Sequence, residues 1–215
     1  MTDPYFNRPE ISNSDLGWLD EYFMPREQVG DREAAYRFGT LVDAIVTEPE
    51  KVDYFRRTVE GEVYSREDFD RAGQMKKALR RNEMWQNIVK LSDFQKVFAG
   101  SVPFQVGRVN FSLEMRCKYD FWIRGMGWGG DLKSTSATTQ KQFIEACEHF
   151  DYDRSRALYM LLSGAKQDIL VGVSKQNYKV FTFTIRQGDP FYMRGLEKLE
   201  SLAFRWWCLF DGLTF

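Results

Sequence analysis

Apolar positions recur every three or four residues through most of the first hundred residues, and this spacing predicts amphipathic helices. Residues suited to capping stand at two of the expected starts: Ser12 or Ser14 before the first helix, and Ser65 before the third. The predicted helices comprise one that ends at Phe23, one at 32–47, one from 65 to about 81, and one or two short helices within 85–98. We therefore expect residues 1–100 to be mainly helical.

After about residue 100 the pattern changes to runs rich in aromatic and β-branched residues, partly alternating with polar ones, which are typical of strands. The predicted strands cover 104–110, 112–123, 131–135, 168–174 and 179–185. Helical spacing returns at 138–149 and 152–163 and in a last amphipathic helix at 188–211. We expect an α/β fold, a central mixed β-sheet flanked by helices. A single domain would cover 1–215, with 101–186 forming the sheet core and two helices.

The strand predicted at 112–123 carries a row of charges on one face. Because side chains alternate across a strand, Glu114, Arg116, Lys118 and Asp120 share that face, and the residues between them face the core. Asp120 is the last charge before the strand continues into apolar residues. The least demanding interpretation of such a row is a solvated strand face.

The next predicted strand adds Asp131 and Lys133, which again share a face. A glycine-rich turn, GMGWGG at 125–130, would join the two strands into an antiparallel hairpin and bring Asp120 close to Asp131. Two neighbouring carboxylates repel unless a proton or a cation lies between them. Mg²⁺ prefers oxygen ligands and keeps several waters, and Lys133 would orient or help deprotonate one of them. A charged surface hairpin is the competing interpretation.

Composition excludes several other kinds of site. The chain holds only three cysteines, without a CxxC pair, and one histidine, His149. This argues against a disulfide framework, a four-cysteine metal or iron–sulfur site, and a Ser–His triad. The net charge of −1 gives no support for DNA binding and does not exclude it.

The chain shows no sign of membrane insertion or secretion. No run of apolar residues is long enough to span a bilayer, and the first residues lack a charged-then-apolar leader. We expect a cytoplasmic protein, in the host cytoplasm if a phage encodes it, with no membrane partner.

The order of these residues resembles a known signature. Asp120 is followed after ten residues by DLKST at 131–135, which resembles the PD-(D/E)xK nuclease superfamily and most closely its RecE/RecB-like, phage-type exonuclease branch. There the first strand reads roughly R-C-x-x-D and the second D-x-K-T-T; this chain has RCKYD at 116–120. The resemblance implies a restriction-endonuclease-like core with a helical N-terminal part, Mg²⁺ or Mn²⁺ as cofactor, and DNA as substrate.

Two further segments resemble the same branch. FGTLVDAIVTEP at 38–49 is similar to a helix that supplies a metal ligand, with Asp43 where the family usually has His. FDYDRSRALYML at 150–161 is similar to the family's Y-D-x-Q-x-A-x-Y helix, with Ser155 where Gln is usual and with Tyr152 and Tyr159 retained. Carboxylates suit Mg²⁺, so we expect Asp43 to keep the ligand role. The shorter reach of Ser155 weakens the expected substrate contact.

These observations predict a set of site residues. The catalytic residues are Asp120, Asp131 and Lys133. The metal ligands are Asp43, Asp120, Asp131 and the Leu132 backbone carbonyl, with Glu114 as a lesser candidate for which a salt bridge to Arg116 or Lys118 competes. The substrate-binding candidates are Ser134, Thr135, Gln140, Tyr152, Ser155 and Tyr159.

The function that follows is a Mg²⁺- or Mn²⁺-dependent DNA exonuclease of phage or mobile-element recombination or repair. An endonuclease or nickase on the same fold is one alternative, and a non-catalytic DNA-binding or assembly module is another. Partners beyond DNA would be further copies of the chain, arranged as a ring, or a recombination protein.

Overall fold

The computed structural model describes residues 4–25 and 31–211. Its seven α-helices in these ranges are α1 (Asn13–Phe23), α2 (Arg32–Thr47), α3 (Arg66–Arg81), α4 (Glu83–Leu91), α5 (Gln140–His149), α6 (Tyr152–Ser163) and α7 (Pro190–Trp206). The strands are β1 (Val52–Asp53), β2 (Thr58–Val59), β3 (Glu62–Val63), β4 (Ser92–Val106), β5 (Val109–Ile123), β6 (Trp128–Thr135), β7 (Gln167–Ser174) and β8 (Val180–Arg186). Short 3-10 helices cover Pro4–Asn7 and Pro49–Lys51, and a π-helical turn covers Trp207–Asp211.

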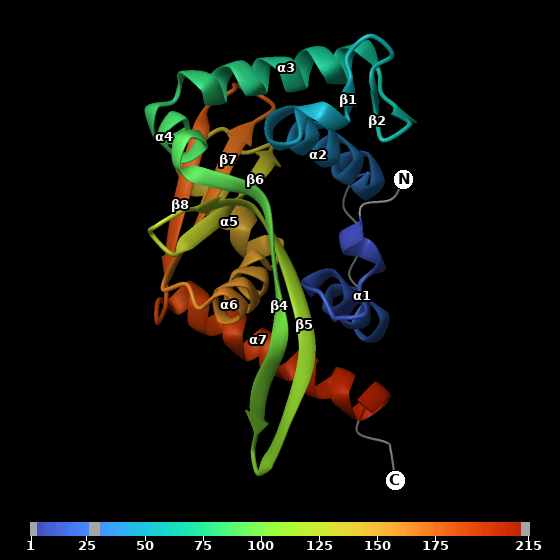
Figure 1. Cartoon of the computed structure of the whole chain (residues 1–215), viewed down its shortest axis with the longest axis vertical. Coiled ribbons are helices and arrows are strands. Elements are labelled where there is room, and N and C mark those ends of the chain that lie inside the picture. The colour runs from blue at the N-terminus through green and yellow to red at the C-terminus, as the bar shows by residue number, and fades with distance from the viewer. Residues whose placement is uncertain (1–3, 26–30, 212–215) are drawn as a thin grey trace.

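A five-stranded sheet in the order β4-β5-β6-β7-β8 forms the centre (Figure 1). All neighbouring strands are antiparallel except β6 and β7, which are parallel. Parallel neighbours need a long crossover, and α5 and α6 supply it. The expected mixed α/β fold is therefore confirmed.

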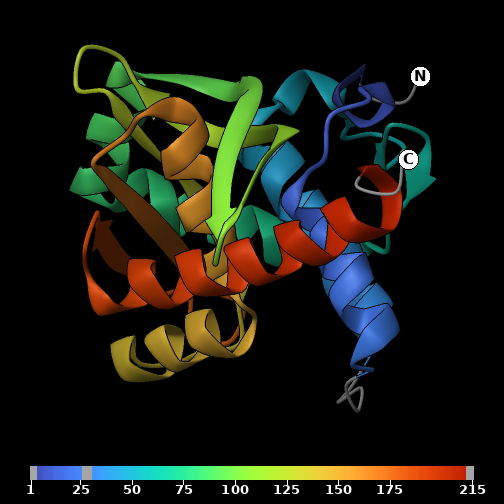
Figure 2. The same ribbon diagram turned by 90° about the horizontal axis from the view of Figure 1, so that it is seen from below.

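Helices cover both faces of this sheet. One apolar cluster joins the sheet to α2, α3 and α4, and the other joins it to α1, α5, α6 and α7. Figures 1 and 2 show α7 running across the molecule on the side away from α3. Most buried apolar side chains of the described chain belong to these two clusters, so the sheet is packed on both faces.

Local sequence patterns place most elements correctly. Helices α2 and α6 have the predicted bounds, and Ser12 and Ser65 cap α1 and α3 through their side chains. In α1, Ser12 and Asp15 form a complete capping box that satisfies backbone donors at the helix start.

Two predicted segments are wrong. Residues 92–98 are strand and not helix, because α4 ends at Leu91 and β4 pairs with β5 from Ser92 onward. Residues 104–110 are not one strand, since the chain turns between Val106 and Val109 with Gly107 at φ +61°. The predicted last helix is present, as α7 up to Trp206 and as a π-helical turn from there to Asp211. Residues 1–100 also contain the small sheet β1-β2-β3. Its strands are only two residues long, too short to show a hydrophobic pattern in the sequence.

Among residues 4–25 and 31–211, no helix combines the length and the apolar character that a membrane crossing requires.

Candidate active site

The predicted hairpin between β5 and β6 is present. Phe121 pairs with Gly130 and Ile123 with Trp128 in an antiparallel register. Gly130 is required here, because a Cβ at this position would lie 2.0 Å from the backbone oxygen of Ile169 on β7. Asp120 and Asp131 are the next residues in this register, at the point where β6 leaves β5.

The two strands are joined at that point by a side chain. The Leu132 backbone N–H donates to Asp120 Oδ2 at 2.7 Å. This bond fixes one oxygen of Asp120 against the peptide of β6. The Leu132 peptide, whose carbonyl we predicted as a ligand, therefore lies beside the Asp120 carboxylate.

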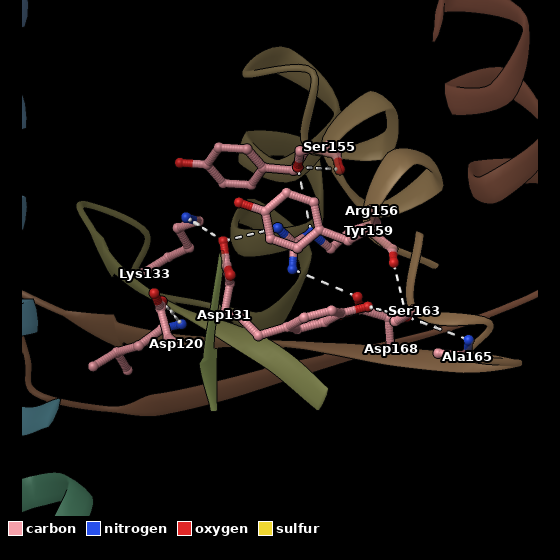
Figure 3. A network of polar contacts seen from close by, with 12 residues as sticks. Asp120, Asp131, Lys133, Ser155, Arg156, Tyr159, Ser163, Ala165 and Asp168 are labelled. Atoms are coloured by element: carbon pink, nitrogen blue, oxygen red, sulfur yellow. Dashed lines mark hydrogen bonds and ion pairs between the residues drawn. The ribbon is translucent and has the colours of Figure 1, made fainter. Parts of the chain in front are cut away.

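Asp131 uses one carboxylate oxygen for two cations. Lys133 Nζ lies 2.7 Å and Arg156 Nη2 lies 3.0 Å from Asp131 Oδ2, as Figure 3 shows. Asp131 is buried, and its Oδ1 has no hydrogen-bond partner among the described residues. A buried carboxylate oxygen without a partner is costly, so its presence calls for an explanation.

Arg156 is completely buried and connects Asp131 to a second acid. Its Nη1 lies 3.5 Å from Oδ2 of the equally buried Asp168, and the Tyr159 ring centroid is 4.0 Å from its guanidinium carbon (Figure 3). Its Nε donates to Ser155 Oγ at 3.3 Å. Together these contacts fix the guanidinium and, through it, the orientation of Asp131.

Asp43 reaches the same region from α2. The Thr47 hydroxyl donates to Asp43 Oδ1 at 2.9 Å, and Gln95 Nε2 on β4 lies 3.4 Å from Asp43 Oδ2. The charge of Asp131 acts on Asp43, and the charge of Asp43 acts on Asp120. The structure therefore brings the three predicted carboxylates into one electrostatic group.

The carboxylates of this group differ in how burial and neighbouring charges shift their pKa values. Burial, together with the charges of Asp131 and Asp43, raises the pKa of Asp120 well above its ordinary value. Burial also raises the pKa of Asp43. Burial by itself would raise the pKa of Asp131, but the neighbouring Arg156 and Lys133 outweigh it and lower that pKa. Asp131 is therefore the carboxylate that stays ionised most easily.

Lys133 stays protonated. Burial by itself would lower its pKa, but the adjacent Asp131 carboxylate outweighs burial and raises it. The ammonium group also lies 5.1 Å from the centroid of the Tyr152 ring, which favours the charged form. As it stands in this structure, Lys133 is a proton donor and a source of positive charge.

A divalent cation fits this group of residues. Raised pKa values at Asp120 and Asp43 signal carboxylates that lack enough positive charge, and Asp131 Oδ1 is an oxygen without a partner. In residues 4–25 and 31–211, however, no three His, Cys, Asp or Glu side chains are arranged to hold a metal by themselves. Neutral oxygens such as the predicted Leu132 carbonyl are needed to complete the coordination.

Other predicted substrate contacts lie around this centre. Tyr152 lies beside Lys133, and Tyr159 stacks on Arg156. Ser155 is buried and donates to the Tyr152 carbonyl while it accepts from Arg156, so its hydroxyl faces inward and not toward a substrate. Ser134 is half-buried on β6, with its Oγ 3.8 Å from where a Cβ of Gly39 on α2 would stand.

Three predicted candidates do not join the centre. Glu114 is exposed and lies six residues before Asp120 on the same strand, about 20 Å away at about 3.3 Å per residue, which is too far to ligate a shared cation. Gln140 donates to the Thr182 carbonyl of β8 and attaches α5 to the sheet. Thr135 is buried and accepts from the Ala137 N–H in the turn after β6.

Arg156, Asp168 and Gln95 were not predicted. The sequence could have indicated Asp168, because it is a lone acid at the start of the apolar run of β7. A carboxylate buried in such a run needs a partner of opposite charge or a hydrogen-bond donor. Arg156 stands in the segment that resembles the family helix, but nothing in the sequence shows that it faces inward. Gln95 lies in a segment that the sequence pattern predicted as helix, so its position opposite Asp120 on a neighbouring strand could not be predicted.

The sheet order and the Asp–Asp–Lys arrangement on one hairpin define a PD-(D/E)xK-type domain. The family described as a PDDEXK-like domain of unknown function (DUF3799) matches residues 23–209, and the chain belongs to it. A comparison with curated protein sequences gives no match.

Solved structures share the fold. A protein of Eubacterium rectale described as a candidate exonuclease is similar with a TM-score of 0.63 and 19% identity, over 95% of this chain and 82% of that one. A phage-related exonuclease of Haemophilus somnus 129PT gives a TM-score of 0.44 at 12% identity, over 95% and 96% of the two chains. An alkaline exonuclease of Laribacter hongkongensis gives 0.43 at 11%, over 94% and 84%. At these identities the first likeness supports the fold alone.

Proposed function

We propose that this protein is a divalent-metal-dependent deoxyribonuclease that hydrolyses phosphodiester bonds. The observation that carries the proposal is the state of Asp131. One of its oxygens is held by Lys133 and Arg156, and the other is buried, unpartnered and close to the charge of Asp120. This arrangement leaves one Asp131 oxygen, on the carboxylate next to Asp120, for a ligand.

Each residue has a distinct proposed role. Asp43, Asp120, Asp131 and the Leu132 carbonyl would hold the cation, with Mg²⁺ or Mn²⁺ suited to these oxygen donors. When bound, such a cation lowers the pKa of water and stabilises negative charge on a phosphate. Lys133, protonated beside Asp131, would orient the attacking water and donate a hydrogen bond to the phosphate oxygen on which charge develops. Tyr152 at the rim would contact the DNA strand.

We favour an exonuclease within this class. The support is the sequence resemblance of RCKYD, DLKST and the flanking helices to an exonuclease branch, and the protein of Eubacterium rectale that shares the fold is itself described as a candidate exonuclease. Roles in phage or mobile-element recombination, a ring of several copies, and a single domain over the whole chain stay predictions from the sequence.

Digestion of linear and closed circular DNA with Mg²⁺, with Mn²⁺ and with a chelator tests the proposal. We expect degradation of linear DNA only, dependent on the cation. Asp131→Asn and Lys133→Met should each lower the rate by about 100-fold or more, as the loss of one preorganised charge does elsewhere. Glu114→Gln is the matched control and should keep full activity. Cleavage of circular DNA would mean an endonuclease, and undiminished activity of Asp131→Asn would contradict the site.

A further inference from the structure

Gln95 has an unusual backbone conformation beside the candidate site. Its φ is +54°, in the left-handed region that side chains other than glycine rarely adopt, and it lies within strand β4. The flanking pairs, Phe94 with Phe121 and Lys96 with Tyr119, place it directly across from Asp120. A strained residue inside a regular strand needs a compensating interaction, and such residues gather at functional sites.

The Gln95 side chain has only half of its hydrogen-bonding capacity satisfied. Nε2 donates to Thr47 Oγ1 at 3.0 Å and lies 3.4 Å from Asp43 Oδ2. The Thr47 hydroxyl in turn donates to Asp43, so the amide nitrogen is the end that points to these two acceptors. Oε1 is buried and has no partner among the residues that the structure describes. The protein thus maintains backbone strain and an unpaired carbonyl oxygen at one residue.

We propose that Gln95 is a ligand of the divalent cation through Oε1. The inference rests on the function proposed above, since it assumes that Asp43, Asp120 and Asp131 hold that cation. An amide oxygen is a suitable ligand for a hard cation. It also adds a ligand oxygen without adding another negative charge beside Asp43, Asp120 and Asp131.

The arrangement around Gln95 fits this role. Mg²⁺ demands a near-octahedral set of oxygen ligands, and a neutral side-chain oxygen can complete a set to which the acids contribute. Because Thr47 and Asp43 hold the amide nitrogen, the oxygen of the same planar group is held in position before any ion binds. The alternative is that Gln95 only orients Asp43 through its N–H groups and leaves the cation untouched.

Calorimetric titration of the full chain with Mn²⁺ separates these roles, using Gln95→Glu and Gln95→Met. Glutamate keeps a ligand oxygen but loses the N–H donors, and methionine lacks both. We expect Gln95→Met to bind Mn²⁺ at least tenfold more weakly and Gln95→Glu to bind at least as tightly as the unaltered chain. If Gln95→Glu weakens binding as much as Gln95→Met does, Gln95 acts through its N–H groups and the ligand role is wrong.

Thermal unfolding gives a second readout that does not depend on activity. Gln95→Gly relieves the left-handed strain, so the metal-free variant should unfold at a higher temperature, while the gain on adding Mn²⁺ should shrink. Arg57→Gly is the matched control, since Arg57 also has a positive φ, +57°, but lies in the exposed turn between β1 and β2. It should raise the metal-free unfolding temperature and leave the gain from Mn²⁺ unchanged.

Two outcomes distinguish failure of this inference from failure of the proposed function. If the unaltered chain binds no Mn²⁺, the metal-dependent function itself is contradicted. If the unaltered chain binds Mn²⁺ and all three Gln95 variants bind it equally well, the function stands and Gln95 is not a ligand.

Discussion

The two ends of the β4–β5 hairpin are built from the same pair of strands but differ in chemistry. At the far end, Phe111 stacks on Phe104 with ring centroids 5.4 Å apart and on Trp207 at 5.2 Å, in a well-packed apolar contact. At the near end, Asp120 lies opposite a strained Gln95 and beside other buried acids. The far end is optimised for stability, whereas the near end keeps unsatisfied polar groups that stability alone would remove.

The largest effect that tests this contrast is expected from Arg156→Met. The change leaves Asp131 and Asp168 buried without the guanidinium that joins them. Removing one partner of a buried ion pair costs about 3–5 kcal/mol, so chemical denaturation should show a loss of that order. Adding Asp168→Asn to this variant should restore part of the loss, because one uncompensated charge is then removed. An unchanged unfolding free energy would mean that the network contributes nothing to stability.

Phe111→Ala tests the apolar end. Truncating a buried aromatic ring costs about 3 kcal/mol or slightly more, and denaturant unfolding should show it. The folded fraction should bind Mn²⁺ as the unaltered chain does, because Phe111 lies nine residues before Asp120 on β5. A large loss of metal affinity would contradict the view that the apolar end of the hairpin stabilises the fold without contributing to the candidate site.

Asp120→Asn should stabilise the metal-free protein, whereas the two substitutions above destabilise it. The amide removes a buried charge whose pKa is raised by burial, Asp131 and Asp43, so the metal-free variant should be more stable than the unaltered chain. Its metal affinity and its proposed nuclease activity should both fall sharply. The comparison of denaturation with and without Mn²⁺ checks both effects, and a destabilised metal-free variant would contradict the electrostatic account.

The contrast also explains what could be predicted from sequence. Helices α2 and α6 were predicted with their observed bounds from their apolar period, although Asp31 caps α2 through its side chain and no side-chain bond caps the start of α6. Strand β4 was missed at its start because its pairing with β5, and not its local pattern, makes residues 92–98 extended. Asp120, Asp131 and Lys133 were proposed from their spacing, and the structure places them together. Arg156 and Gln95 were missed, since burial and a positive φ arise only from tertiary packing.

The last prediction concerns the pH dependence of the metal-free protein, to which Asp168 contributes. Burial raises the pKa of Asp168 to about 7, against the neighbouring Arg156, while an unfolded aspartate titrates near about 4. Between these values the folded state binds more protons than the unfolded state. Stability from this group is therefore full below about pH 4 and is lost as the pH rises toward about 7, by at most about 1.4 kcal/mol per pH unit.

Asp131 contributes in the other direction, because its lowered pKa gives stability that disappears as the pH falls below about 4. Chemical denaturation of the chelated protein across pH 4–8 should therefore show stability declining above mildly acidic pH, with Asp168→Asn flattening the decline. Mn²⁺ should counteract the decline at neutral pH, because ionised Asp43 and Asp120 then have a counter-charge. If the chelated protein instead gains stability between pH 5 and pH 7, then Asp168, Asp43 and Asp120 do not have raised pKa values in the folded state. The view that Asp43 and Asp120 need a cation as counter-charge would then be contradicted.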